Sequence, residues 1–228
     1  MRIDILTLFP EMFECLNCSI IGRAREENKV EINIINIRDF SKDKHKKCDD
    51  TPFGGGAGMV MTPAPLFDAI NSVKGEKSLV VLTSPRGQTF NQTMVESLAK
   101  EEHLVIVCGH YEGVDERIID LCVDREISIG DFVLTGGEIP AMAMVDAIAR
   151  YLPNVIKKDS LSEESFSNFL LEYPQYTRPQ IFQNLAVPDV LISGHHDNIK
   201  KWRLEKSLEI TKKNRPDLYK KYAKTKKK

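Results

Sequence analysis

The sequence lacks any long hydrophobic run. No apolar stretch among its 228 residues reaches the roughly 18 residues that a membrane-spanning helix requires. The first residues, MRIDILTLFPEMF, carry Asp4 and Glu11 and contain no small-residue cleavage site, so they do not resemble a secretory signal. We therefore expect a cytoplasmic protein without a membrane partner.

Cysteine is also scarce. The five cysteines are odd in number, which argues against a disulfide framework. Cys15 and Cys18 form a CxxC motif, but Cys48, Cys108 and Cys122 supply no second pair at a metal-binding spacing. We interpret Cys15 and Cys18 as two small residues one turn apart on a helix, and we assign no metal site.

Signatures of common nucleotide-binding loops are missing too. The segment GGGAG, residues 54–58, matches neither the P-loop nor the GxGxxG pattern, and this disfavours a nicotinamide-dependent dehydrogenase. GGGAG lies in residues 38–61, which show no periodicity, and it follows a basic cluster from Lys42 to Lys47. Such a long segment is either a loop that wraps phosphate or ribose, or a flexible surface loop.

Charge is divided unevenly along the chain. Residues 199–228 hold thirteen Lys or Arg against three Asp or Glu, a net charge of +10, whereas the other residues carry −11. This asymmetry indicates a polyanionic partner for the C-terminal part. The alternative for the final KTKKK is a solvated lysine end.

Apolar runs and alternating segments predict strands that alternate with helices. The expected strands are 2–9, 30–37, 79–83 and 104–108, and the expected helices are 10–27, 62–73, 91–101, 115–121 and 138–152. This order predicts an α/β domain with a mainly parallel sheet. Residues 153–176 are polar and serine-rich, as is typical of a linker, and helices near 199–213 and 216–224 predict a small helical domain.

Three apolar runs end in glycine-bearing loops, at residues 79–87, 103–113 and 128–137. In open α/β sheets, ligands bind at loops between strand and helix, and glycine lets the backbone approach a ligand closely. The three loops therefore predict one shared pocket. The helix at 138–152 is apolar nearly all round, which predicts burial, with a subunit interface as one place for it.

Eight segments resemble, in the same order, the bacterial tRNA (guanine-37-N1)-methyltransferases, the TrmD type within the SPOUT class. They are DILTLFPEMF, GGGAGMVM, LTSPRG, CGHYEGVDERI, SIGDFVLTGGEIPAM, YTRPQIF, VPDVLISGHH and IKKWRLEKSL, and they cover nearly the whole chain. The resemblance implies a knotted α/β domain at 1–160, a linker at 161–176 and a helical tRNA-binding domain at 177–228. The knot would be a deep trefoil, an exception to the near absence of knots in proteins. An obligate homodimer with active sites built from both subunits is implied as well.

The resemblance also implies a cofactor and a substrate. S-adenosylmethionine would be held bent by the knotted loops, and magnesium could take part but is not assigned. The substrate would be tRNA with guanosine at positions 36 and 37, methylated at N1 of guanosine-37 beside the anticodon. The implied cofactor contacts are Ser84, Pro85, Gly87, Gly109, His110, Tyr111, Ile129, Gly130, Asp131, Phe132, Val133, Leu134, Gly136 and Gly137.

Methylation of guanine at N1 requires a base, because this nitrogen carries a hydrogen and has no free lone pair. In the family pattern the base is an aspartate directly before a Ser-Phe pair. Here Glu164 precedes Ser165 and Phe166, so the carboxylate is kept on a side chain one methylene longer. Glu163 is the reserve candidate.

Negative charge spreads toward O6 of guanine as the proton leaves, and a fixed cation there stabilises the transition state of the flipped base. The family pattern assigns this role to Arg150, which could instead be a helix-terminus partner. Glu112 matches a family glutamate near the cofactor and is expected to help place guanine or a cation. His110 stands where some relatives carry Arg, so that a cationic role there depends on pH. Asp131 is expected near the sulfonium, or it is simply a turn residue.

Basic residues of the C-terminal part are expected to contact tRNA phosphates, with affinity that falls steeply with salt. These are Arg178, Lys200, Lys201 and Arg203. Trp202, the only tryptophan, is either part of this surface or core of the small domain.

Two alternative functions stay open. One is a knotted RNA methyltransferase with another target nucleoside. The other is a tRNA-binding protein of the same fold with impaired catalysis, which only the glutamate at position 164 favours.

Overall fold

The chain divides into two compact units. The computed structural model describes residues 1–157 and 164–226, and the units are Met1–Ile156 and Lys157–Lys228. Glu163, the reserve candidate for the base, lies outside the described residues. No helix in residues 1–157 and 164–226 is long and apolar enough to cross a membrane.

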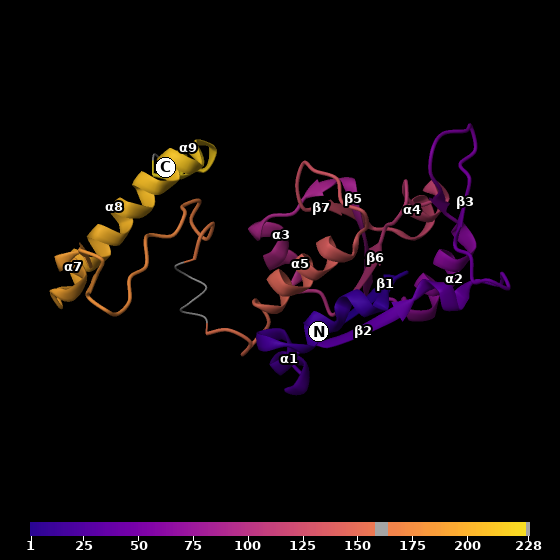
Figure 1. The fold of residues 1–228 in the computed structure, drawn as a ribbon, viewed down its shortest axis with the longest axis horizontal. Helices are drawn as coiled ribbons and strands as arrows, with labels where there is room; N and C mark the ends of the chain where they lie inside the picture. Colours follow the sequence, from indigo (N-terminus) through magenta and orange to yellow (C-terminus); the bar gives the residue numbers. More distant parts are fainter. Residues whose placement is uncertain (158–163, 227–228) are drawn as a thin grey trace. The chain divides into compact units, whose positions relative to one another are not determined.

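The first unit is organised around a five-stranded sheet (Figure 1). Its strands are β1 (Arg2–Thr7), β2 (Glu31–Asn36), β5 (Ser78–Thr89), β6 (His103–Cys108) and β7 (Arg125–Ser128). The strand order is β2-β1-β6-β5-β7, and every neighbouring pair is parallel. The predicted mainly parallel sheet is confirmed. All strands therefore end at one edge of the sheet.

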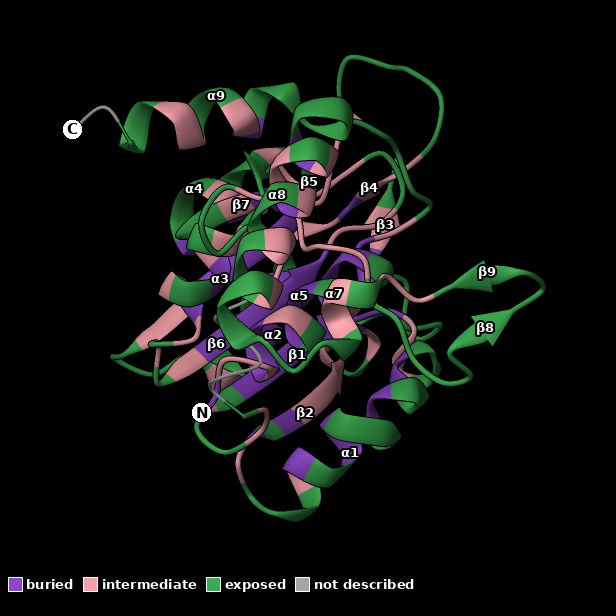
Figure 2. Cartoon of the chain, turned by 90° about the vertical axis from the view of Figure 1, so that its left-hand side faces the viewer, coloured by how far each residue is buried: buried purple, intermediate pink, exposed green. Residues whose placement is uncertain are grey.

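Helices cover both faces of this sheet, as parallel sheets require. Side chains alternate along the central strand β6, so that Leu104 and Ile106 enter one core cluster while Val105 and Val107 enter the other. The elements packed in the first cluster are η1 (Pro10–Asn17), α1 (Ser19–Glu26), α3 (Gln92–Leu98) and α5 (Glu138–Ala149). Those in the second are η2 (Ile37–Phe40), α2 (Pro63–Val73) and α4 (Glu116–Cys122). Figure 2 shows the buried strands in purple between these layers.

The single helix expected at 10–27 is interrupted. Residues Pro10–Asn17 form a 3₁₀ helix, Cys18 has extended backbone with φ −110° and ψ 162°, and α1 begins at Ser19. The buried side chains explain the break, because the five-residue step from Leu16 to Ile21 does not keep one face of a continuous helix. The prediction that Cys15 and Cys18 share one helix is therefore wrong.

Residues 38–61 contain short elements that the sequence did not predict. Strands β3 (Asp49–Asp50) and β4 (Val60–Met61) form an antiparallel pair. The basic cluster before them is an ordered turn, since the Asp43 carboxylate accepts hydrogen bonds from the backbone N–H groups of His45 (2.8 Å) and Lys47 (3.3 Å). These two bonds lower the pKa of Asp43. Two-residue strands leave no periodicity for a sequence pattern to reveal.

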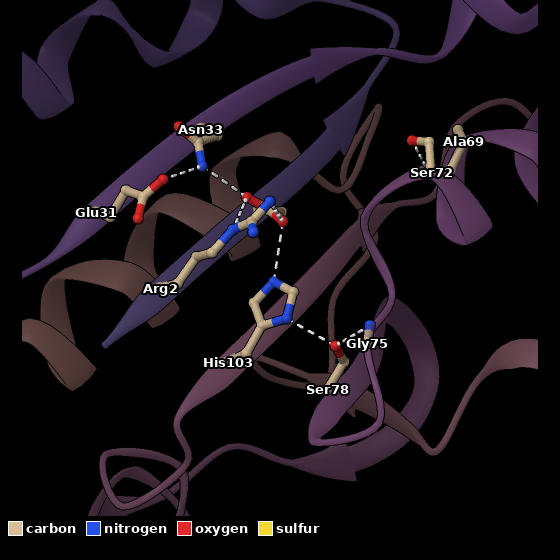
Figure 3. Close-up of polar contacts among 9 residues, drawn as sticks. Arg2, Glu31, Asn33, Ala69, Ser72, Gly75, Ser78 and His103 are labelled. Atoms are coloured by element: carbon tan, nitrogen blue, oxygen red, sulfur yellow. Dashed lines mark hydrogen bonds and ion pairs between the residues drawn. The ribbon is translucent and has the colours of Figure 1, made fainter.

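A buried polar network ties the strands together at their amino ends (Figure 3). Asp4 on β1 is fully buried, and its carboxylate accepts hydrogen bonds from Arg2 Nε (3.1 Å) and Asn33 Nδ2 (2.8 Å). His103 Nε2 lies 2.9 Å from Asp4 Oδ2, and His103 Nδ1 lies 2.6 Å from Ser78 Oγ. A buried carboxylate persists only where such partners replace water. The network joins β2, β1, β6 and β5 at their amino ends, opposite to the edge where the carboxyl ends of the strands lie.

The second unit is mostly helical in its described part. Its elements are β8 (Ile181–Phe182), β9 (Leu185–Ala186), α7 (Asp189–Ile192), α8 (His196–Asn214) and α9 (Pro216–Thr225). The two helices predicted near 199–213 and 216–224 correspond to α8 and α9. The hairpin β8-β9 and helix α7 were not predicted. Ile181, Phe182 and Leu185 on the hairpin are exposed, as its green colour in Figure 2 shows.

Candidate functional site

Three loops, one a bulge within β5 and the other two after β6 and β7, line one cavity of about 280 Å³. They are the loops that the glycine pattern predicted to share a pocket. The predicted cofactor residues that line the cavity are Ser84, Pro85, Gly109, His110, Tyr111, Ile129, Gly130, Phe132, Val133, Leu134, Gly136 and Gly137. Gly87 and Asp131 do not line it. Their cofactor roles stay predictions.

The first loop is a bulge within β5. Thr83 and Gln88 both pair with Ile127 of β7, so the residues between them leave the ladder and reach the cavity. Gly87 lies directly against the backbone of Glu126 and Ile127, where a Cβ atom would collide. Only glycine leaves room for this close approach of the bulge to the backbone of β7.

Arg86 of this bulge, inside the segment 84–87 expected to contact the cofactor, also lines the cavity. Its guanidinium lies 3.1 Å from Glu116 Oε2 and 3.3 Å from Glu126 Oε2. These carboxylates raise the pKa of Arg86, which is thereby held as a cation on the cavity wall.

The three loops meet at Gly137. Its N–H donates to Gly109 O at 2.7 Å, and a Cβ atom here would collide with Thr83 Oγ1 and with the backbone of Cys108 and Gly109. Glycine is required by this close approach of three backbone segments. In the sequence, this contact is indicated by the pair Gly136 and Gly137 directly before an apolar helix.

Apolar side chains of the third loop form one wall of the cavity. Phe132 is 55% exposed, Val133 83% and Leu134 37%, although each is a large hydrophobic residue. Exposed apolar groups beside a cavity mark a binding surface for an apolar or aromatic ligand group.

Glu138 is a functional candidate that the sequence did not reveal. It begins α5, is 1% exposed, and accepts a hydrogen bond from Thr7 Oγ1 at 2.9 Å. Its Oε2 lies 3.9 Å from Nδ1 of His110, a buried nitrogen without a hydrogen-bond partner in the described structure. A carboxylate in the first turn of a helix is favoured by the helix dipole. The signal in the sequence is one acid at the start of an otherwise apolar helix.

The histidine facing Glu138 is held between aromatic rings. The His110 ring centroid lies 4.9 Å from those of Phe9 and Tyr111. Below it, burial and then the nearby Glu138 carboxylate hold the pKa of the Cys108 thiol well above its ordinary value. Cys108 is therefore a neutral core residue, and Glu138 lies buried next to the cavity-lining His110.

Glu112 lines the same cavity beside the GGGAG segment. Its backbone N–H donates to Met59 O at 2.9 Å, and Gly58 lies against its side chain with no room for a Cβ atom. The structure therefore brings the glycine-rich segment at 54–58 next to a predicted catalytic residue.

Arg150 does not line the cavity of its own chain. It caps the C-terminal end of α5, a helix of 12 residues, which separates it from Glu138 by about 18 Å at 1.5 Å per residue. Glu164 belongs to the second unit, where it is partly buried.

The predicted RNA-binding residues differ in exposure. Arg178, Lys200 and Lys201 are exposed. Arg203 is half-buried, and its guanidinium carbon lies 4.6 Å from the centroid of the Tyr173 ring. Trp202 is also half-buried, and its ring centroid lies 6.3 Å from that of Tyr176.

A parallel α/β sheet whose carboxyl-end loops enclose one cavity defines the class of open α/β proteins that bind a small ligand at these loops. Comparison with known proteins narrows this class. The model of the family described as tRNA (Guanine-1)-methyltransferase TrmD matches residues 1–221. The chain belongs to this family.

Curated relatives agree over nearly their whole lengths. The chain is 60% identical over 224 residues to a tRNA (guanine-N(1)-)-methyltransferase of Clostridium botulinum (strain 657 / Type Ba4), covering 97% of this chain and 93% of the relative. It is 59% identical over 228 residues to a protein of the same description from Clostridium beijerinckii, covering 99% and 95%.

Proposed function

We propose that this chain is an S-adenosylmethionine-dependent tRNA methyltransferase that methylates N1 of guanosine-37 in tRNA with guanosine at positions 36 and 37. The observation that carries the proposal is the cavity at the meeting of three glycine-bearing loops, in a chain of the tRNA (Guanine-1)-methyltransferase TrmD family. The relatives described above are named for the same guanine-N1 methylation.

The cavity suits the cofactor. Phe132, Val133 and Leu134 offer apolar surface for an adenine ring, and the glycine positions let backbone groups approach a ligand. When bound, S-adenosylmethionine supplies a methyl group on a sulfonium whose thioether leaves without charge. Magnesium has no assigned place in this proposal.

We include a deep trefoil knot in the proposal, as the SPOUT-like fold implies. The loops that would form it are those that meet at Gly137, where the start of α5 contacts the backbone after β6 and the Thr83 side chain of β5. The described helices α8 and α9 would belong to the tRNA-binding domain.

The active site would need two subunits. Arg150 lies about 18 Å along α5 from Glu138, which follows the cavity-lining Gly137, and this is farther than an arginine side chain extends. An apolar surface for a partner exists beside α5, where Ile139 is 47% exposed and Met12 of η1 is 40% exposed. Cys15 Sγ lies 3.2 Å from Met142 Sδ, so η1 and α5 form one continuous surface. A second copy on this surface would supply Arg150 to the cavity.

The chemistry then follows from the side chains. Glu164 accepts the N1 proton of the flipped guanine, and Arg150 stabilises the charge that develops at O6. Glu112 and His110, both on the cavity wall, are placed to orient guanine or to offer a donor. Lys200, Lys201 and Arg178 are exposed for tRNA phosphates.

A single-turnover assay tests this function. Labelled S-adenosylmethionine and tRNA with guanosine at 36 and 37 are mixed with wild type, Glu164→Gln or Arg150→Ala. Wild type should label N1 of guanosine-37, and Glu164→Gln should slow the chemical step about 100-fold or more while both ligands still bind. Wild type that binds both ligands without transfer would instead support the catalytically impaired tRNA-binding protein. A label on another nucleoside would support the other methyltransferase alternative.

A further inference from the structure

We propose that Tyr173 and Arg203 anchor the base-bearing turn, residues 164–172, on helix α8, and that Arg203 is a positioning residue and does not bind a tRNA phosphate. The inference rests on the proposed function, because it takes Glu164 as the base. It departs from the expectation that Arg203 contacts tRNA.

The base-bearing turn is closed by its own hydrogen bonds. Ser165 Oγ accepts from the N–H of Glu172 at 3.0 Å, which joins the two ends of the turn. Ser167 Oγ donates to Glu164 O at 2.8 Å. The backbone of Glu164 is therefore held by the residues that follow it.

Two phenylalanines in this turn have unfavourable backbone conformations. Phe166 has φ 78° and Phe169 has φ 60°, although both carry a Cβ atom. The N–H of Phe166 donates to Leu170 O at 2.8 Å. Left-handed backbone at residues other than glycine persists where surrounding contacts fix it, and it gathers at functional sites. In this turn the fixing contacts are its own hydrogen bonds and one bond from Leu171 to α8.

One stripe of α8 faces the segment that continues from the turn. Arg203, Ser207 and Thr211 are four residues apart and so lie on one helix face. Thr211 is fully buried, and its hydroxyl donates to Ser207 O at 2.6 Å while it accepts from the N–H of Leu171 at 2.8 Å. This bond fixes the end of the turn to the helix.

The second attachment lies two turns of helix away. The Arg203 guanidinium carbon is 4.6 Å from the centroid of the Tyr173 ring, which is within cation–π distance. The Arg203 Nε atom is buried. A planar guanidinium stacks on an aromatic ring in a way that an ammonium group does not. Arg203 therefore faces the protein segment, whereas Lys200 and Lys201 of the same helix are exposed.

Helix α8 thus bears two exposed lysines on its surface, and the turn that contains Glu164 is attached to the same helix. Binding of RNA phosphates by Lys200 and Lys201 would move the base together with the RNA-binding surface. The anchor pair Tyr173 and Arg203 would determine how accurately Glu164 is placed, and a small misplacement of a reacting group lowers the rate strongly.

Kinetics and salt dependence separate a positioning role from phosphate binding. We expect Arg203→Lys and Tyr173→Leu each to lower the single-turnover rate at saturating tRNA about tenfold, the loss expected for one partly desolvated cation–π contact. Tyr173→Phe keeps the ring over which Arg203 lies, so it should lower the rate less than Tyr173→Leu does. In both slow variants the slope of the logarithm of the tRNA binding constant against the logarithm of salt concentration should stay unchanged.

Variants of the exposed lysines are the comparison. Lys200→Ala and Lys201→Ala should each reduce that salt slope by about one, as loss of a phosphate contact does. The proposal is overturned if Arg203→Lys retains the wild-type rate, or if Arg203→Ala reduces the salt slope as the lysine variants do.

Amide hydrogen exchange tests the anchor without methyl transfer. The Leu171 amide, bonded to Thr211 Oγ1, should be protected in wild type and should exchange faster in Thr211→Val, Tyr173→Leu and Arg203→Lys. Glu209→Gln, an exposed change on the same helix, should leave its exchange unchanged. If wild type transfers no methyl but this protection pattern holds, the proposed function fails and the anchor stands. Equal exchange in wild type and the three variants would refute the anchor, even in an active enzyme.

Discussion

At the scale of single residues, the buried carboxylate of Glu138 connects the core of the first unit with the cavity. Glu138 is 1% exposed and sits where the third loop enters α5, with Thr7 and His110 as its neighbours. A carboxylate is retained in such a place when it is hydrogen-bonded and placed at a helix N-terminus. Its position beneath a cavity-lining histidine links the core of the sheet to the proposed active site.

Replacement of Glu138 by alanine should destabilise the fold. Glu138→Ala leaves the Thr7 hydroxyl without its acceptor in a buried place, which costs about 1–3 kcal/mol of the free energy of unfolding. Glu138→Gln keeps an acceptor oxygen and the shape of the side chain, so its cost should be smaller. Urea unfolding measures both. Glu96→Ala, an exposed change on α3, is the matched control and should stay within about 0.5 kcal/mol of wild type. An equal effect of Glu138→Ala and Glu96→Ala would contradict a stabilising role of the buried Glu138.

At the scale of the element, helix boundaries follow local signals where those signals are strong. Pro63 opens α2 and Pro216 opens α9, each at a position where the missing N–H costs nothing. The break at Cys18 had no such signal. It arises because η1 and α1 must both turn apolar side chains toward one sheet face.

The start of α9 provides a pH-dependent contact. Arg215 beside Asp217 lowers the pKa of that carboxyl to about 2 from an ordinary 3.8. Because the folded-state value is the lower one, the contact stabilises the helix above about pH 4 and is lost as the pH falls toward 2. Thermal unfolding of Arg215→Gln and wild type should differ at pH 5, and the difference should shrink as the pH falls toward 2. A difference that stays constant over this range would show that the ion pair does not contribute.

At the scale of the whole molecule, we propose that the active site is shared between two chains. The cavity lies in the first unit, and Arg150 lies at the C-terminal end of α5, about 18 Å along the helix from its start next to the cavity. In the proposed homodimer, the Arg150 of one chain would serve the cavity of the other.

Subunit mixing tests the shared site. Leu134→Arg places a charge on the cavity wall, and Arg150→Ala removes the proposed cation, so each homodimer should be inactive. In a purified heterodimer of the two variants, one site carries both changes and the other carries none, so about half of the wild-type activity should return by the two-fold symmetry. If the heterodimer stays inactive, Arg150 acts in the site of its own chain, and the proposed shared site is wrong. Two separately tagged wild-type subunits are the control for heterodimer purification.

Local sequence patterns were enough to predict most of the strands and helices of the first unit. Apolar runs and period-two alternation depend on neighbouring residues, so β1, β2, β5 and β6 could be predicted, as could the three glycine-bearing loops and their common cavity. The resemblance in eight segments was sufficient to name the family that the comparison then showed.

Which distant side chains meet follows from the folded structure and not from any local pattern. Glu138 contacts Thr7 across 131 positions of sequence, and Leu171 bonds Thr211 across 40, separations that no local pattern encodes. The same holds for Arg203, whose basic character suggested a phosphate contact while its packing on Tyr173 gives it a place within the protein. Charge and periodicity are properties of the chain, but burial is a property of the fold, and burial determines what a charged side chain can do.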